Sequence, residues 1–392
     1  MNKKQLLIIF LVVFIDLLGF GMVIPILPYY AKTFGASGVE VGWLMMSYSA
    51  MQFLFSPFWG RLSDKIGRRP VLLICLAGIG SSMVVLAMAS SFMWLLVARV
   101  LAGFFGANIS AASAYIADIT TPENRAKGMG LIGAAFGAGF LFGPALGGIL
   151  SQWGYDKAPL FAAGLSVINL IFAFKSLVEP ALSERERASH RNRFNREMWL
   201  QIISTPQTGL AILLFFIVTL GIAQMETTFA LFLLSRFGLD AFHAGLILAL
   251  MGLIMVGIQG GGIGKLAKKF GERKLILYGA VLMMLALGGA GLSRTIPLFV
   301  LFSAVQAAGY GITSPSLMSL VSRYAPVGQQ GATMGVYQSA GSLGRILGPL
   351  CAGFLFDVFS PSTPFFVASG LFVIVFLFGS LKGSAWSSDA TC

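Results

Sequence analysis

The chain has 392 residues, of which 57% are hydrophobic and only 11% are charged, and its formal net charge is +12. A soluble domain carries about 25% charged residues, so this chain has too few charges to cover a surface that faces water. The composition excludes a soluble enzyme, and the high apolar content excludes a disordered chain. It leaves a membrane protein made of helices, because a membrane β-barrel would show alternating segments of about ten residues instead of long apolar runs.

Twelve apolar segments are predicted to span a membrane, since a spanning helix needs about 20 residues. In chain order they are roughly 5–30, 41–59, 71–90, 93–116, 127–152, 158–178, 207–234, 242–263, 275–293, 296–321, 331–356 and 363–381. The first segment follows Lys3 and Lys4, as in a signal peptide, but it lacks a small-residue cleavage site. We interpret it as an uncleaved helix.

The most polar stretch, 179–201, separates the spans into six and six. We expect an N-terminal six-helix bundle over 1–178, a cytoplasmic connector over 179–206, a C-terminal six-helix bundle over 207–382 and a short polar tail over 383–392. The halves repeat, since residues 129–148 match 334–353 at a constant offset of 205. Parallel repeats of six spans are a transporter architecture, with the substrate site at the interface of the halves.

The positive charges predict the orientation of the chain. With both termini in the cytoplasm, 21 of the 27 Lys and Arg residues lie on the cytoplasmic side and 4 lie outside. Basic residues favour the cytoplasmic side of a membrane, so this bias predicts that both termini are cytoplasmic.

Four motifs resemble those of the major facilitator superfamily. Residues 60–69 match the loop signature between helices 2 and 3, residues 99–106 resemble the helix 4 signature, and residues 139–148 resemble the helix 5 signature of antiporters. Asp16, together with the prolines of 25–28, resembles helix 1 of the twelve-span drug/proton antiporters. The nearest likeness is to the bacterial tetracycline/proton antiporters, but their acidic residue in helix 3 is replaced here by Ser82.

The resemblance implies an all-α membrane protein with two pseudo-symmetric six-helix bundles in the bacterial inner membrane. It implies proton-coupled efflux of small amphipathic drugs by alternating access, driven by the proton gradient without a bound cofactor. The partners are the substrate, protons and membrane lipid, with no nucleic acid, and a monomer is expected. Ser82 leaves tetracycline itself in doubt as the substrate. A symporter or facilitator for a nutrient, siderophore or lipid, and a non-transporting receptor or scaffold, are the alternatives.

Four charged residues lie within the predicted spans. Asp16 is about 16 Å deep in the first helix, at 1.5 Å per residue. A charge near the bilayer centre costs at least about 2.5–3.5 kcal/mol, which favours a functional site. Asp16, Glu226 and Arg99 are the candidates for proton coupling, and Arg345 is a buried cation without an assigned role. A purely structural hydrogen bond or ion pair is the alternative for each.

The remaining candidates form three groups. The resemblance implies a cytoplasmic clasp that holds one conformational state, with the members Gly60, Asp64, Gly67, Arg68, Arg69 and Asp118. The alternative is that the basic residues near this turn only set the orientation of the chain in the membrane. The helix 5 signature consists of Gly139, Gly143, Pro144, Gly147 and Gly148. These residues form either a flexible contact between helices, as expected in an antiporter, or an ordinary packing contact of small residues. Polar and aromatic residues within spans are candidates for the substrate cavity: Tyr29, Tyr30, Gln52, Asn108, Tyr115, Gln224, Gln306, Tyr310, Tyr337 and Gln338. No metal-ligand spacing or nucleotide-binding motif is found in the sequence.

Overall fold

The computed structural model describes residues 3–120, 122–180, 196–325 and 330–381, and every element in these ranges is a helix. The predicted polar tail, 383–392, and most of the predicted connector lie outside the described residues. The fold class predicted from the sequence, an all-helical membrane protein, is confirmed.

One compact unit contains residues 1–192 together with 239–252, and the other contains 193–238 together with 253–392. The helices of the first unit are α1 (Lys3–Thr33), α2 (Gly38–Ile66), α3 (Arg68–Ala87), α4 (Phe92–Gly106), α5 (Ile109–Ile119), α6 (Pro122–Ser151) and α7 (Lys157–Ser176), with the first part of α11 (Ala241–Gly257). The helices of the second unit are α9 (Arg196–Ser204), α10 (Pro206–Phe237), the π-helical turn η1 (Ile258–Gly262), α12 (Ile263–Phe270), α13 (Glu272–Leu292), α14 (Ile296–Arg323), α15 (Gln330–Val358) and α16 (Thr363–Leu381).

Eleven helical segments of the described chain are long and apolar enough to cross a membrane, by length and composition. The remaining predicted span is α2, which has 29 residues but carries Glu40 near its start and charged residues near its end. Two predicted spans are interrupted. The fourth breaks between α4 and α5, and the eighth passes through the π-helical turn before it ends at Phe270.

The helix ends follow local capping chemistry. Ser37 and Glu40 form a capping box that starts α2, in which each side chain satisfies a backbone N–H of the other residue. Gly67 has φ of +106° and Gly238 has φ of +65°, conformations in which residues with a Cβ are strained, and they end α2 and α10. These caps explain why most helices extend a few residues beyond the apolar segments.

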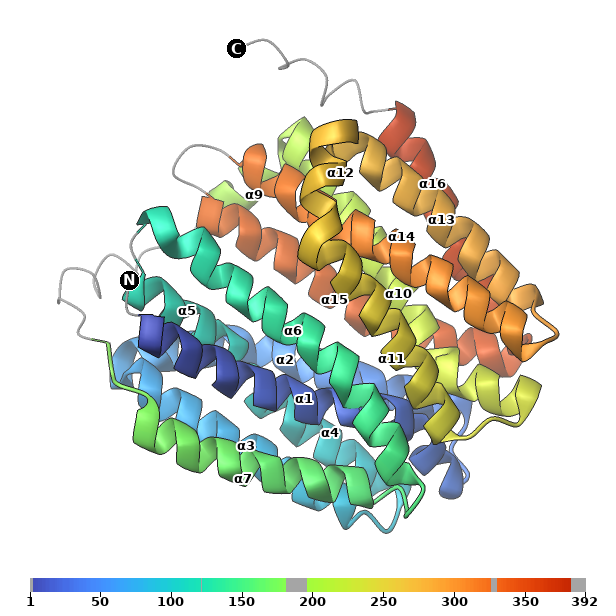
Figure 1. Cartoon of the computed structure of the whole chain (residues 1–392), viewed down its shortest axis with the longest axis horizontal. Helices are drawn as coiled ribbons and strands as arrows, with labels where there is room; N and C mark the ends of the chain where they lie inside the picture. Colours follow the sequence, from blue (N-terminus) through green and yellow to red (C-terminus); the bar gives the residue numbers. More distant parts are fainter. Residues whose placement is uncertain (1–2, 121, 181–195, 326–329, 382–392) are drawn as a thin grey trace. The chain divides into compact units, whose positions relative to one another are not determined.

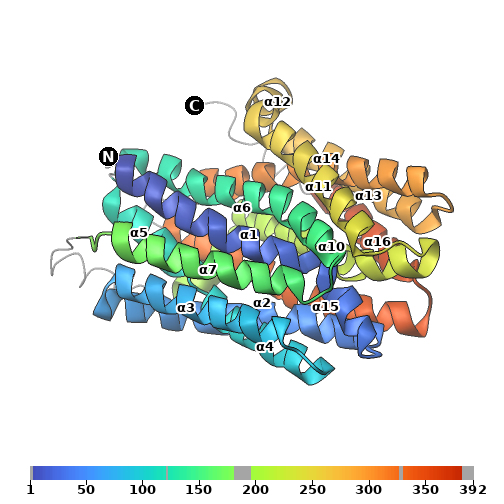
Figure 2. The same ribbon diagram turned by 60° about the horizontal axis from the view of Figure 1, so that its bottom comes forward.

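In the first unit, α1 packs along α6 on one side and α7 on another (Figures 1 and 2). Its contact with α6 is the most extensive helix pair of the chain, and small residues make it possible. A Cβ added at Gly143 would lie 2.7 Å from Cα of Gly21, and one at Gly147 would fall against the carbonyl oxygen of Met22. The helix 5 signature therefore forms a seam with α1, in which the two backbones are in direct contact.

The same face of α6 also meets α11. A Cβ at Gly148 would lie 3.1 Å from the carbonyl oxygens of Ala241 and Phe242, and one at Gly252 would lie 2.9 Å from Cα of Leu141. The first part of α11 therefore belongs to the first compact unit, although the following residues of the same helix belong to the second.

Replacement of Gly143 by alanine should destabilise the protein, because the added methyl group overlaps the backbone of Gly21. Overpacking of this kind costs about 1–3 kcal/mol. Gly133→Ala is a matched control on the same helix, since no atom lies within 4 Å of a Cβ added at that position. Thermal unfolding in detergent should show a lower melting temperature for Gly143→Ala only; equal melting temperatures would contradict the seam.

Candidate functional site

Asp16 lies in the middle of α1, one turn before the α1–α6 seam closes at Gly21. Its Oδ2 accepts a hydrogen bond of 3.1 Å from Nδ2 of Asn108. Asn108 stands at the break between α4 and α5, where the continuous backbone hydrogen bonds of a helix are interrupted. Asn108 is 5% exposed, and its Oδ1 is buried without a partner among the described residues. The break thus supplies a buried amide to a carboxylate within the apolar part of the unit.

Arg99 on α4 is 3% exposed. Its guanidinium lies 4.4 Å from the ring centre of Tyr48 and 5.7 Å from that of Phe20, and its Nε donates to the carbonyl oxygen of Leu44 at 3.4 Å. Cation–π contacts contribute about 2 kcal/mol when the cation is desolvated. In the described part of the chain no hydrogen bond or ion pair joins Arg99 to Asp16. The structure therefore places Arg99 in an aromatic cage instead of beside the candidate proton site.

The second unit holds the other two charges of the spans. Glu226 is the one exposed residue in the stretch 221–233 of α10, which is otherwise buried. Its carboxylate interacts electrostatically with the Arg345 guanidinium of α15. Tyr310 of α14 interacts with both charges, and Tyr337 of α15 with Arg345. The structure therefore brings four of the predicted residues into one cluster.

Arg68 is the centre of the predicted clasp. It contacts the carboxylate of Asp64 one turn earlier, and its Nε lies 2.8 Å from Oδ2 of Asp118 at the end of α5. Its Nη1 also donates to Oγ of Ser63 at 2.7 Å. The side chains of Arg68 and Asp118 are 3% and 4% exposed, so the pair is buried. The predicted combination of Asp64, Arg68 and Asp118 exists within the first unit.

Glu179, three residues after the end of α7, completes the clasp and was not predicted as a site residue. Its two carboxylate oxygens accept from the backbone N–H groups of Arg68 and Arg69, at 2.7 and 2.8 Å. These N–H groups belong to the first turn of α3, where an anion is favoured. Gly67 fits this position for two reasons, its positive φ and a Cβ position only 2.7 Å from Oε1 of Glu179. The sequence signal that could have identified Glu179 is an acidic residue at the predicted cytoplasmic end of a span, where basic residues are expected.

The other two members of the clasp differ in their role. Arg69 donates from Nη2 to the carbonyl oxygen of Phe174 at 2.6 Å and stacks over the Phe174 ring, which joins α3 to the end of α7. Gly60 was expected to allow close helix approach, but a Cβ there would meet its nearest atom, Oγ of Ser110, at an ordinary 3.9 Å. Packing within the unit therefore does not require glycine at position 60.

Several predicted cavity residues serve helix packing within the first unit. The hydroxyl of Tyr30 donates to the carbonyl oxygen of Ala89 at 3.0 Å, and Nε2 of Gln52 donates to that of Gly106 at 2.9 Å. Tyr115 is fully buried, with its hydroxyl 2.8 Å from the carbonyl oxygen of Val178. Tyr29 donates to the carbonyl oxygen of Leu239 at 3.2 Å, which ties α1 to the loop before α11. These contacts give the four side chains a structural role.

The residues predicted in the second unit are more varied. Gln224 and Gln306 are 2% and 4% exposed, and each has a buried Oε1 without a partner among the described residues. Gln338 is exposed, Tyr310 is half-buried, and Tyr337 stacks on Phe215 with ring centres 3.8 Å apart. Ser82 stands at the position where the sequence analysis expects the acidic residue of the tetracycline antiporters. It is buried and donates to the carbonyl oxygen of Ile79 in its own helix.

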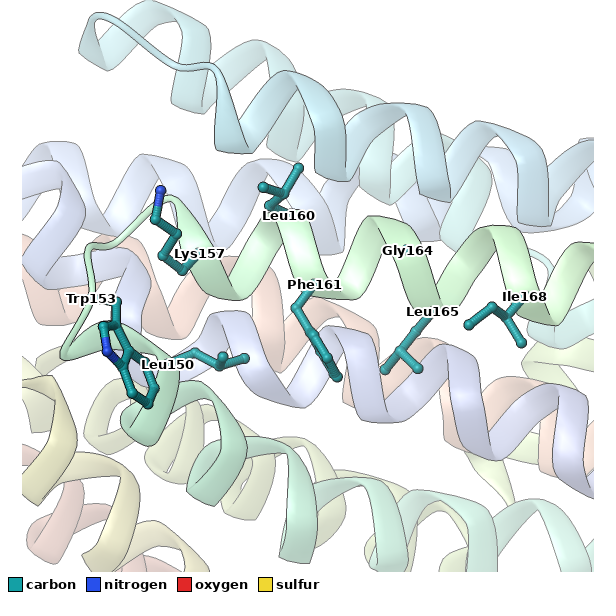
Figure 3. Close-up of a pocket in the computed structure, with 8 residues that line it drawn as sticks. All are labelled: Leu150, Trp153, Lys157, Leu160, Phe161, Gly164, Leu165 and Ile168. Carbon is teal, nitrogen blue, oxygen red and sulfur yellow. The ribbon is translucent and has the colours of Figure 1, made fainter.

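A separate groove lies on the outer surface of α7 and the end of α6 (Figure 3). Its lining is apolar apart from Lys157 at one end: Leu150, Trp153, Lys157, Leu160, Phe161, Gly164, Leu165 and Ile168. Trp153 and Ile168 are 66% and 61% exposed, as expected of side chains that face lipid. The groove contains none of the charged residues predicted for transport.

The sequence matches the family model described as "Major Facilitator Superfamily" over residues 9–263 and 262–384. It is 33% identical over 375 residues to "Tetracycline resistance protein, class E" of Escherichia coli, covering 91% of this chain and 89% of that protein. It is 30% identical over 367 residues to "Multidrug resistance protein 2" of Bacillus subtilis, covering 91% of this chain and 90% of that protein.

The fold is similar to the crystal structure of the human organic anion transporter MFSD10 (TETRAN), with a TM-score of 0.72 and 27% sequence identity. The comparison covers 96% of this chain and 99% of that chain. The major facilitator fold that the motifs predict is therefore confirmed. The match to a family of transporters also confirms that the chain is not an enzyme.

Arg68→Ala should lower the free energy of unfolding by about 3–5 kcal/mol, because it leaves the carboxylate of Asp118 buried without its cation. The double variant Arg68→Ala/Asp118→Ala should recover part of this loss. Arg61→Ala, which removes an exposed cation in the last part of α2, is the control. Denaturant unfolding in detergent measures all four proteins; an Arg68→Ala protein as stable as Arg61→Ala would disprove the buried pair.

Proposed function

This chain belongs to the Major Facilitator Superfamily, and we propose that within it the protein is a proton-coupled antiporter that exports small amphipathic molecules by alternating access. The observation that carries the proposal is the Asp16–Asn108 pair in the apolar interior of the first unit. The tetracycline and multidrug resistance proteins among its relatives support the export of drugs or related compounds. The bacterial inner membrane, with both termini in the cytoplasm, is the proposed location.

The surroundings of Asp16 suit a group that gains and loses a proton. The ionised carboxylate accepts from Nδ2 of Asn108. A protonated carboxyl would instead donate, and the buried Oδ1 of the same amide is free to accept after rotation of the side chain. One residue can therefore hydrogen-bond the carboxyl group of Asp16 in both protonation states, so neither state leaves that carboxyl unpaired in the apolar interior.

The packing of α1 links this proton to helix position. Asp16 is on the helix whose backbone touches α6 at Gly21 and Gly143, where a shift of one helix cannot be absorbed by flexible side chains. Protonation changes the hydrogen bond between α1 and Asn108, at the junction of α4 and α5. A ligand drives a conformational change only through different affinities for the two states, and the protonation of Asp16 would supply that difference.

The clasp centred on Arg68 has a different task in this proposal. Arg68 stands at the start of α3. The clasp joins it to Asp64 near the end of α2, to Asp118 near the end of α5 and to Glu179 in the segment that follows α7. These contacts keep the cytoplasmic ends of four helices in one arrangement. We propose that the clasp stabilises one conformational state while Asp16 selects between states.

Asp16→Asn should abolish proton-driven transport, because an amide cannot bind and release the proton. The purified protein is placed in proteoliposomes with an imposed pH gradient, and the fluxes of the cation rhodamine 6G and of the sulfonated dye sulforhodamine B are followed by fluorescence. Asp156→Asn is the matched control, since that carboxylate is 40% exposed and paired only with Lys157. Melting temperature in detergent should be unchanged for both variants.

Three outcomes of this assay decide the mechanism. Full proton-driven flux in Asp16→Asn would remove Asp16 from the coupling. Flux of substrate in the same direction as protons would identify a symporter instead of an antiporter. Substrate movement that ignores the gradient would identify a facilitator.

A further inference from the structure

Arg345 lies in the middle of α15 with little of its hydrogen-bonding capacity used. A guanidinium carries five N–H donors, and the one hydrogen bond described for it runs from Nη2 to Oγ of Ser342, at a long 3.3 Å. Among the described residues no carboxylate lies within 4 Å of it. Arginine keeps its charge even in an apolar setting, so this cation needs water or an anion beside it.

Arg99 shows what a structural cation looks like in the same chain. It is 3% exposed and enclosed by Tyr48, Phe20 and the carbonyl oxygen of Leu44. Arg345 is only half-buried and has no such cage among the described residues. The two cations at mid-helix positions therefore differ, and Arg345 is the more exposed of the two.

Glycines of α15 set the position of Arg345 against α10. A Cβ at Gly344 would lie 2.9 Å from the backbone nitrogen of Leu220, and one at Gly348 would lie 2.7 Å from Cβ of Ala223. Arg345 follows Gly344 directly, and Glu226 is three residues beyond Ala223, so the two charges lie on the helix pair that makes this contact. They interact electrostatically, but no ion pair within 4 Å joins them in the described chain.

The surroundings of Arg345 combine polar groups with aromatic rings. Gln338, Ser342 and Arg345 are spaced by four and three residues, so they lie along one stripe of α15, and none of them is fully buried. Tyr310 of α14 is half-buried beside both charges. One turn before it, Gln306 presents a buried Oε1 that has no partner in the described residues. Such a surface suits a ligand with a ring system and one acidic group.

We propose that the substrate is an amphipathic organic anion or zwitterion and that its carboxylate, sulfonate or phosphate binds the guanidinium of Arg345. This inference rests on the proposed transport function, and it specifies the substrate class. Arginine binds such groups with two parallel N–H donors, which a lysine cannot reproduce. Glu226 interacts electrostatically with Arg345, so its carboxylate competes with the substrate anion for the guanidinium.

The test is a binding measurement that does not depend on transport. Fluorescence polarisation of sulforhodamine B, whose sulfonates stay ionised, is followed as the full-length protein in detergent is added, and rhodamine 6G is the cationic probe with the same ring system. Arg345→Gln should weaken sulforhodamine B by about tenfold or more, the effect of one charge-assisted interaction, and should leave rhodamine 6G unchanged. Arg345→Lys should recover only part of the loss.

Two further variants separate the site from general charge effects. Glu226→Gln should tighten sulforhodamine B by a factor of about two to ten, because the competing carboxylate is gone. Arg323→Gln removes a cation of α14 that is 64% exposed, and it should change neither probe. Melting temperatures in detergent confirm that each variant is folded, and Arg345→Lys retains the charge if Arg345→Gln does not fold.

The proposal is overturned if wild-type protein does not bind sulforhodamine B saturably, if Arg345→Gln weakens both probes equally, or if Glu226→Gln weakens sulforhodamine B. These outcomes say nothing against proton-driven export, which is measured in proteoliposomes. Conversely, normal binding with no proton-driven flux would disprove the proposed function and leave the anion site intact.

Discussion

A charge held among apolar helices must be compensated locally, and this constraint organises the first unit of the molecule. Three buried charges of this unit meet it differently. Asp16 receives a buried amide from Asn108, Arg99 receives two aromatic rings and a carbonyl oxygen, and Arg68 receives two carboxylates. Because leaving such a group unpaired costs several kcal/mol, helix breaks and caps are placed where they can supply the partner.

The break between α4 and α5 illustrates how the backbone serves this purpose. A continuous helix would use the backbone groups around position 108 internally, whereas the break turns the Asn108 side chain toward α1. In the same way, the positive φ of Gly67 ends α2 so that the first N–H groups of α3 point at Glu179. Irregular backbone lies beside both acidic residues: at Glu179 it presents free backbone N–H groups, and at Asp16 it carries the residue whose side-chain amide donates.

The sequence predicted the helices, their order and the members of the clasp other than Glu179, because hydropathy and short motifs are local properties. All twelve predicted segments coincide with helices to within several residues. It did not predict which residue pairs with which charge. Asn108, a candidate for the substrate cavity, donates to Asp16, and Arg99, a candidate for proton coupling, lies against Tyr48, Phe20 and the carbonyl oxygen of Leu44. Such pairings depend on helix rotation, which one sequence does not reveal.

Protonation of Glu226 and protonation of Asp16 have different effects on substrate binding in the proposed mechanism. Protonation of Glu226 would remove the competitor for Arg345, so a proton and a substrate anion would bind the second unit together. Antiport requires the opposite, since the proton must favour the state from which the substrate has left. In the proposed mechanism the exchanged proton is therefore assigned to Asp16, which has its own partner in Asn108. On this reasoning Glu226 adjusts the affinity for the substrate. Proton and substrate are coupled because they favour different conformational states, and they do not compete for one site.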